Sequence, residues 1–386
     1  MAVSGAPSVE RELALSHWGY LTFAYALPLA AAAVLEAGTA LFSDVWSRAR
    51  LIVLGQGLLA ASLFFTSWTS SSWGLALGLA VAGAASGVAC GAAQALLVLS
   101  SSDTTDRVMV RWSLFCAIGD VCTPLATAIA IATGHSYRAA MGAVAVVVCV
   151  QCGVSVGLLC GAGGIPDANL RSEHEGDPES PDGAAERVHV AFLRALRFPR
   201  LWGWLFAAAS CTLLDELVVA LAVLRLDRDR AASPALATAA AVTFSLGAIV
   251  GSAVTDRAVS RTSACTVLVT SAVLTAAALL VLRVSGSAPI ACAALLLVGI
   301  ACAPHHPLAM AQAYGAVPER PGTVQAIGQI FVLVDIAAPL VLGLVADHFG
   351  LDAAIGCLLI QPAIIAACGV LLGRTPPSPV IAAPRR

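Results

Sequence analysis

Charged residues are scarce in this chain, and lysine is missing altogether. Only 11% of the 386 residues are charged, and all 21 basic residues are arginine. A soluble domain carries roughly 25% charged residues, so a water-covered surface of ordinary composition is excluded. A surface that faces hydrocarbon needs no charge. Because 59% of the residues are hydrophobic, the composition predicts an integral membrane protein.

Several site signatures are also missing. The net charge of −2 and the lack of a basic stripe argue against a nucleic-acid partner. We find no zinc motif, nucleophile elbow or phosphate-binding loop, so we expect neither an enzyme nor an ATP-driven pump, and no cofactor. Cys149 and Cys152 form a C-x-x-C pair, but no histidine or second cysteine pair lies near it, so no metal site is expected.

What the sequence does have is long apolar runs. A spanning helix needs about 20 mostly apolar residues, and eleven such runs are separated by polar turns. They lie at about 18–42, 51–69, 74–99, 108–133, 138–161, 199–224, 235–255, 263–283, 288–314, 322–346 and 350–373. The sequence therefore predicts an all-α membrane protein with eleven transmembrane helices.

A polar segment divides the runs into two groups. Residues 162–190 are acidic and rich in proline and glycine, which is typical of a disordered linker. The apolar residues and arginines that follow, up to residue 198, suggest a short interfacial amphipathic helix. We therefore expect an N-terminal bundle of five spans at 1–161, a linker at 162–198, a C-terminal bundle of six spans at 199–373 and a tail at 374–386.

The placement of the arginines predicts the orientation. When the loop at 43–50 is assigned to the cytoplasm and the sides alternate from there, fifteen arginines fall inside and six outside. This orientation places the linker and the C-terminus in the cytoplasm and the N-terminus outside. The all-arginine basic complement and the wealth of Ala and Gly are typical of a GC-rich bacterial coding sequence, so we expect the bacterial inner (plasma) membrane.

An internal repeat relates the two groups of spans. In each group an aspartate precedes a proline with three residues between them, and Asp120 and Asp335 are 215 residues apart, as are Pro124 and Pro339. Two further pairs have nearly the same offset: Gln94 with Gln312 at 218, and the polar turns that begin at Asp44 and Asp256 at 212. The sequence therefore predicts two pseudo-symmetric helical bundles.

The same offset exposes a gap. The repeat partner of the run at 199–224 would lie mostly before Met1, so the N-terminal bundle has five spans where the other has six. Two explanations remain open: the start codon is set too far downstream, or the protein lacks the first helix of a twelve-helix plan.

These features together resemble the major facilitator superfamily. The resemblance rests on the two six-helix halves, the central cytoplasmic loop, and an acidic-then-basic turn after the second helix of each half. The family's turn reads G-x-x-x-D-R-x-G-R-R; here the first copy is LFSDVWSRAR, without the glycine, and the second is GSAVTDRAVSR, with altered spacing. The resemblance implies a fold of two helical bundles that transports small molecules, without enzyme activity.

The resemblance also implies a cytoplasmic gate at these turns. In the family the carboxylate and guanidinium groups of the turn hold the two halves together on the cytoplasmic side and separate on opening. The alternative is a topology signal only, with an Asp beside inward-facing arginines. The residues that inherit the gate interpretation are Asp44, Arg48, Arg50, Asp256, Arg257 and Arg261.

Ionisable residues inside the runs are candidates for proton coupling or substrate binding, because each costs at least about 2.5 kcal/mol in hydrocarbon. They are Glu36, Asp120, Asp215, Glu216, His305, His306 and Asp335. Asp120 and Asp335 lie near the middle of their runs, where a carboxyl can carry a coupling proton or bind a cationic substrate. The alternative is a neutral aspartate that bonds a neighbouring helix near its proline.

The other candidates carry similar alternatives. Asp215 and Glu216 are adjacent, hence about 100° apart on a helix, so only one is expected to face a cavity. Glu36 is either a second coupling site or part of the gate. Arg111 is expected to reach back towards Asp103 or Asp106.

Two groups of neutral or weakly basic side chains complete the set. His305 and His306 lie between Pro304 and Pro307, which predict breaks in their helix and a substrate-facing kink; the alternative is a packing kink. Gln94 and Gln312 are the repeat-related amides of the third and ninth runs.

The function predicted from this set is secondary active transport of a small molecule, with proton-coupled export of a drug-like or secondary metabolite as first choice. The segment GDVCTPLATA keeps Pro124 but not the glycines of the family's exporter motif, and Gln94 stands where proton-driven drug exporters carry an arginine. A proton-coupled metabolite importer is therefore the close alternative, and a non-transporting receptor or scaffold of the same fold is a third. The expected partners are the substrate, protons and the lipid bilayer, and the protein is expected to be a monomer.

Overall fold

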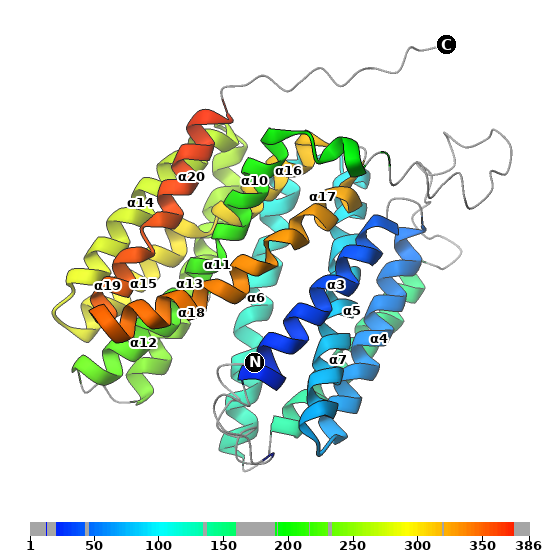
Figure 1. Ribbon diagram of the computed structural model, residues 1–386, viewed down its shortest axis with the longest axis horizontal. Coiled ribbons are helices and arrows are strands. Elements are labelled where there is room, and N and C mark those ends of the chain that lie inside the picture. The colour runs from blue at the N-terminus through cyan, green and yellow to red at the C-terminus, as the bar shows by residue number, and fades with distance from the viewer. Residues whose placement is uncertain are drawn as a thin grey trace, which may run out of the picture. The chain divides into compact units, whose positions relative to one another are not determined.

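The structure is a computed structural model that describes residues 13, 21–42, 46–133, 137–159, 190, 192–215, 217–230, 234–318 and 320–373. Every regular element among these residues is helical (Figure 1). The prediction of an all-α protein is therefore confirmed. The described residues also include a short helical stretch at 192–195, within the range expected for the interfacial helix.

Two compact units make up the chain. Unit 1 comprises Met1–Ser100, Cys122–Ala195 and Arg320–Ile330, and unit 2 comprises Ser101–Val121, Leu196–Glu319 and Phe331–Arg386. Each unit thus takes one segment from the other half of the sequence. The two bundles expected at 1–161 and 199–373, with their linker and tail, stay a prediction.

The helices of unit 1 pack around α4 and α5. Helix α4 contacts α5 and α7, while α5 also contacts α3, and α17 contacts both α3 and α5. Ser47 caps the start of α4, where its hydroxyl accepts a hydrogen bond from the Arg50 backbone N–H at 3.5 Å. The elements are η1 (Leu21–Ala26, a π-helix), α3 (Leu27–Phe42), α4 (Arg48–Trp68), α5 (Ser72–Ser100), α7 (Tyr137–Leu159) and α17 (Pro321–Gly328).

Unit 2 packs its helices around a core of leucine, valine and alanine side chains contributed by α12, α15, α14 and α19. Ser263 caps α14, and Gly350, with φ of 87°, separates α18 from α19 in a backbone conformation that favours glycine. The elements are α10 (Pro199–Ser210), α11 (Thr212–Asp215), α12 (Leu217–Arg230), α13 (Pro234–Val259), α14 (Ala264–Val284), α15 (Ala288–Cys302), α16 (His305–Ala316), η2 (Gln329–Phe331, a 3₁₀ turn that crosses the unit boundary), α18 (Val332–Phe349), α19 (Leu351–Cys357) and α20 (Ile360–Leu371).

Helix α6 (Thr105–Ala132) is shared between the units, because residues up to 121 belong to unit 2 and the rest to unit 1. The repeat-related helix pair α17 and α18 is divided in the same way, with α17 in unit 1 and α18 in unit 2. The internal repeat seen in the sequence therefore extends to how the units are composed.

Glycines bring α13 and α15 into backbone contact. A Cβ atom at Gly247, Gly251 or Gly299 would collide with a backbone carbonyl oxygen of the facing helix, those of Leu296, Ile300 and Phe244 respectively. Small residues that allow close backbone approach are typical of helix pairs in membranes, where dispersion contacts take the place of the hydrophobic effect.

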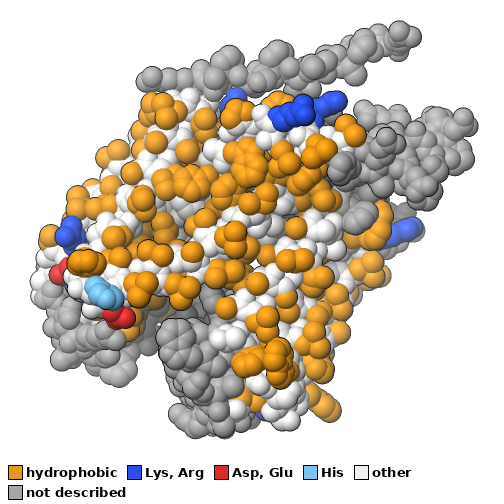
Figure 2. All heavy atoms as spheres, in the orientation of Figure 1, with side chains coloured by type: hydrophobic (Ala, Val, Ile, Leu, Met, Phe, Trp, Pro, Cys, Tyr) orange, Lys and Arg blue, Asp and Glu red, His pale blue; other side chains and the backbone are white. Residues whose placement is uncertain are grey.

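Nine helical segments among the described residues are long and apolar enough to cross a membrane. Apolar side chains are spread over the whole of the visible described surface, whereas charged side chains appear there only in small groups (Figure 2). The two remaining expected runs, 108–133 and 235–255, are occupied by α6 and α13. The total of eleven spans, in a twelve-helix plan minus the first, stays a prediction.

Candidate functional site

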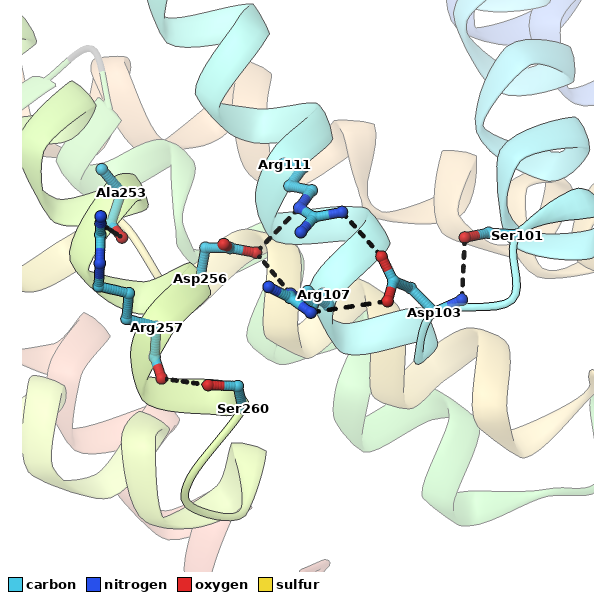
Figure 3. Close-up of polar contacts among 8 residues, drawn as sticks. All are labelled: Ser101, Asp103, Arg107, Arg111, Ala253, Asp256, Arg257 and Ser260. Atoms are coloured by element: carbon cyan, nitrogen blue, oxygen red, sulfur yellow. Dashed lines mark hydrogen bonds and ion pairs between the residues drawn. The ribbon is translucent and has the colours of Figure 1, made fainter.

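An ion cluster in unit 2 joins the start of α6 to the end of α13. The Asp256 carboxylate accepts hydrogen bonds from Nε of Arg107 and Nε of Arg111, each at 3.1 Å. Asp103 binds the other sides of the same arginines, at 2.7 Å to Arg111 and 3.6 Å to Arg107 (Figure 3). The cluster therefore alternates two carboxylates with two guanidinium groups, so its net charge is zero.

The contacts in the cluster also shift the pKa values of Asp256 and Arg107. Burial alone would raise the pKa of Asp256, but the hydrogen bonds and positive charges of Arg107 and Arg111 outweigh it and hold that pKa below its ordinary value of 3.8. The hydrogen bond to Asp256 and its charge raise the pKa of Arg107 in return. Because its pKa is lowered, Asp256 stays ionised at physiological pH.

The other predicted gate residues are placed differently. Asp44 lies outside the described residues. Arg48 is buried in the first turn of α4 and Arg50 is exposed beside it. Arg257 donates to the Ala253 carbonyl oxygen of its own helix at 3.4 Å and points away from the cluster (Figure 3). Arg261 is exposed in the turn after α13.

Asp335 lies at a contact between α11 and α18. Its carboxylate accepts a hydrogen bond of 2.7 Å from the Thr212 hydroxyl, and both residues are partly buried. Asp215 ends the same four-residue helix that carries Thr212, and its side chain is exposed. Glu216 lies outside the described residues. Two of the predicted carboxylates thus belong to one pair of contacting helices.

The remaining predicted carboxylates are not part of the contact between α11 and α18. Glu36 of α3 lies in unit 1, where its carboxyl group occupies the space that a Cβ atom at Gly87 of α5 would need. Gly87 is therefore the residue that lets this carboxyl approach α5. Asp120 lies in α6 and is exposed, and the side chain of Pro124 lies outside the described residues.

The two repeat-related glutamines make similar contacts. Gln94 of α5 accepts a hydrogen bond from the Gln325 amide of α17 at 3.5 Å, and the same amide donates to the Gly91 carbonyl oxygen at 3.2 Å. Gln312 of α16 donates to the Asp106 carboxylate of α6 at 2.9 Å. Each of the two glutamines therefore has a side-chain hydrogen-bond partner on another helix.

The two histidines differ in burial. His305 is 1% exposed, and its Nδ1 lies 3.0 Å from the amide nitrogen of Gln361 of α20, which is fully buried. His306 is exposed on α16. The helix breaks once here, at Ala303 and Pro304, and Pro307 lies within the first turn of α16. His305 is therefore held inside unit 2, whereas His306 is on its surface.

Several partners in these contacts were not singled out from sequence: Arg107, Thr212, Gln325 and Gln361. The spacing of Arg107 and Arg111 by four residues places both on one helix face and is a signal for a shared partner. A lone threonine or glutamine in an apolar run gives no such signal. Among the described residues, no group of three or more His, Cys, Asp or Glu side chains is placed to bind a metal ion.

Sequence comparison decides the family. A profile of the Major Facilitator Superfamily matches residues 5–215 and again residues 205–386. The chain belongs to the major facilitator superfamily. It is thus a multi-pass membrane transporter of that superfamily, as the signature turns and the repeat predicted. No curated protein sequence matches it at a significant level.

Solved structures of superfamily members have the same fold. The E. coli fucose:proton symporter FucP is 14% identical, with a TM-score of 0.70 over 97% of this chain and 95% of that one. The proton:xylose symporter XylE bound to 6-bromo-6-deoxy-D-glucose is 12% identical, with a TM-score of 0.73 over 96% and 91%. The human organic anion transporter MFSD10 (TETRAN) is 17% identical, with a TM-score of 0.64 over 96% and 89%.

Proposed function

We propose that this chain is a proton-coupled secondary transporter of a small molecule, in which Asp335 binds the coupling proton. The supporting observation is the 2.7 Å hydrogen bond from Thr212 to the Asp335 carboxylate. Among the described residues this hydroxyl is the partner of Asp335, and a neutral hydroxyl does not compensate a negative charge. Since an uncompensated carboxylate in hydrocarbon is costly, binding a proton or a cationic substrate relieves that cost.

The repeat assigns Asp120 as the counterpart of Asp335, and Asp215 of α11 as a neighbour on the same helix contact. Glu36, Glu216, His306, Gln94 and Gln312 remain candidates for substrate contact. His305 is a weaker candidate, because its imidazole is buried against Gln361.

The cluster of Asp256 with Arg107 and Arg111 supports the second part of the proposal, a cytoplasmic gate. Charge-assisted hydrogen bonds of this kind are strong enough to hold two helices and still reversible. We assign α6 and the end of α13 to the gate, with Arg257, Arg261 and the first-half residues Asp44, Arg48 and Arg50 in the roles that the signature turn gives them. The gate would lie on the cytoplasmic side of the plasma membrane.

The direction of transport has two candidates. Export of a drug-like or secondary metabolite agrees with Pro124 in the fifth span of the family plan. Import is supported by the names of the two similar structures that are proton symporters, FucP and XylE. At 12–14% identity these structures are similar in fold, so their sugars serve here only as probes.

The proposal is tested with purified protein in vesicles that contain a pH-sensitive dye. We expect proton movement when tetraphenylphosphonium or ethidium is added if the protein exports, and when L-fucose or D-xylose is added if it imports. Asp335→Asn should lower the rate of this proton movement at least about tenfold, because the amide cannot bind and release a proton.

Asp347→Asn is the matched control, since Asp347 lies near the exposed end of α18 in the same helix. It should leave proton movement unchanged. Saturable binding of a probe without any proton or probe flux would contradict the proposal and support a receptor of the same fold. Full activity in Asp335→Asn would reject the assigned role of that residue.

A further inference from the structure

A buried amide links three helices of unit 2. Gln361 of α20 is 0% exposed, and its side-chain nitrogen lies 3.0 Å from Nδ1 of His305 in α16. The same nitrogen donates a hydrogen bond of 3.6 Å to the thiol of Cys211, which follows the last residue of α10. All three residues belong to unit 2, where α10 contacts both α16 and α20. One amide therefore joins α20 to two neighbouring helices.

The directions of these hydrogen bonds agree with one another. An amide nitrogen only donates, so Nδ1 of His305 accepts and the imidazole is neutral, with its proton on Nε2. The Cys211 sulfur accepts from Gln361, and its S–H donates to the Ala207 carbonyl oxygen at 3.4 Å. Gln361 therefore uses both of its N–H bonds, and an acceptor on each side holds the rotation of its amide.

Cys211 occupies the junction between two helices. Helix α10 ends at Ser210 and α11 begins at Thr212, so Cys211 is the residue between them. Its backbone N–H donates to the Ala208 carbonyl oxygen at 3.1 Å, in the tighter spacing of a 3₁₀ turn. Its own carbonyl oxygen accepts from the backbone N–H of Leu214 at 2.9 Å. The side chain of Cys211 is thus a group through which another helix can fix the start of α11.

The next residue makes the contact with the proposed proton site. Thr212 is the first residue of α11 and donates its 2.7 Å hydrogen bond to Asp335 of α18. Consecutive helical residues point about 100° apart, so Cys211 and Thr212 contact different neighbours, α20 and α18 respectively. A shift or rotation of the junction would therefore change the distance between the Thr212 hydroxyl and the Asp335 carboxylate.

Stability alone does not account for an amide at this place. The side-chain oxygen of Gln361 is buried and accepts no hydrogen bond from any described residue. An unpaired buried acceptor is unfavourable, and a methionine of similar size would fill the same space without that cost. A role in holding its two hydrogen-bond acceptors in place accounts for the donor.

We propose that Gln361 is a positioning residue for the proton site: it holds Cys211 at the junction of α10 and α11, and through this junction it places the Thr212 hydroxyl against Asp335. His305 keeps the amide in the rotation that this requires. The inference rests on the proposed function for the role of Asp335, whereas the placement of Thr212 is measured without substrate or flux. The proton site thereby depends on α16 and α20, two helices beyond the α11 and α18 that form it.

The test is infrared difference spectroscopy of the full chain in lipid vesicles. The absorption of the Asp335 carboxyl group is identified as the band that Asp335→Asn removes. Because a hydrogen bond weakens the C=O bond of a protonated carboxyl, Thr212→Val should move this band to higher frequency, and this displacement is the reference. Gln361→Met should move the band in the same direction by most of the reference displacement.

Two cysteines provide a matched comparison. Cys211→Val removes the acceptor at the junction and should move the band as Gln361→Met does, whereas Cys211→Ser keeps an acceptor and should leave the band near its wild-type frequency. Cys368 of α20 donates to the Gly203 carbonyl oxygen of α10 at 3.6 Å, so it joins the same two helices away from the junction. Cys368→Val should leave the band unchanged.

Three results would overturn the proposal. An unchanged band in either Gln361→Met or Cys211→Val would show that the junction does not place Thr212. An equal displacement in Cys368→Val would show a general effect of packing between α10 and α20, and an equal displacement in Cys211→Ser would show that the acceptor is not what matters. If Gln361→Met does not fold, the Cys211 variants provide the test.

Failure of the proposed function gives a different result. If Asp335→Asn removes no band of a protonated carboxyl at any pH, Asp335 does not hold the proton. The same comparison is then made on the carboxylate stretch that Asp335→Asn removes. Equal displacements in Thr212→Val and Gln361→Met would still support the positioning of Thr212, and an unchanged stretch in Gln361→Met would overturn it.

Discussion

At the scale of single residues, Arg225 explains an exception to the arginine distribution. It belongs to a group of arginines expected on the outer side of the membrane, against the general bias. The structure extends α12 to Arg230 and buries Arg225, which is 6% exposed. Its guanidinium donates to the carbonyl oxygens of Leu282 and Arg283 at 2.5 and 2.6 Å, and binds Asp352 at 2.9 Å. Arg225 therefore satisfies the last carbonyls of α14 and ties three helices together.

Replacement of Arg225 should test this role. Arg225→Ala removes the hydrogen bonds to the Leu282 and Arg283 carbonyls and the ion pair with Asp352, and it should lower the free energy of unfolding by about 2–4 kcal/mol. Arg225→Lys should cause a smaller decrease in the free energy of unfolding, because the ammonium group keeps the charge but cannot reproduce the several donors of the guanidinium group. Thermal unfolding in detergent, followed by tryptophan fluorescence, measures the change. Arg257→Ala is the control, since Arg257 is exposed and bonds only its own helix; equal destabilisation by both variants would refute the role of Arg225.

At the scale of helices, proline and glycine gave reliable signals in some places and none in others. Pro304 was expected to break its helix, and the break occurs there. The run at 199–224 was expected to be continuous, but α10 ends at Ser210 and α11 follows, with neither proline nor glycine at the junction. At this junction Cys211 and Thr212 contact other helices, and contacts of this kind are not visible in the periodicity of a single run.

The contact between α13 and α15 gives a prediction at this scale. Gly251→Val should lower the free energy of unfolding by about 1–3 kcal/mol, because its side chain would meet the Ile300 carbonyl oxygen and force the helices apart. Gly343→Ala in α18 is the control, since a Cβ there meets nothing within 4 Å, and helix propensity favours alanine over glycine by about 1 kcal/mol. Calorimetry of both variants in the same detergent measures the difference. If Gly251→Val unfolds at the wild-type temperature, the two backbones are not in close contact.

At the scale of the whole molecule, the repeat organises both units. Each unit receives the first part of one helix from the other half of the sequence, α6 in unit 2 and α17 in unit 1. The ion cluster that we assign to gating includes Arg107 and Arg111 of one exchanged segment, whereas Asp335 and Thr212 lie in parts of unit 2 that come from the second half of the sequence.

The orientation of the molecule is the prediction at this scale. The arginine bias predicts a cytoplasmic C-terminus, so green fluorescent protein fused after residue 373 should fluoresce in bacterial cells. Alkaline phosphatase at the same position should be inactive, because it requires the oxidising side of the membrane. A fusion of each reporter in the turn at 285–287, on the expected outer side, is the control and should give the opposite pair of results. Active phosphatase at the C-terminus would reverse the assigned topology.

The sequence by itself determined the class of the protein: scarce charge, long apolar runs and a repeat of about 215 residues left a helical transporter of two related halves, because hydrocarbon admits few other backbones. It also identified Asp335, Asp256, Gln94 and Gln312 as candidate functional residues. The tertiary structure alone decided their partners, Thr212, Arg107, Gln325 and Asp106. A hydrogen bond joins residues more than a hundred positions apart, and only the packing of helices sets which polar side chains meet.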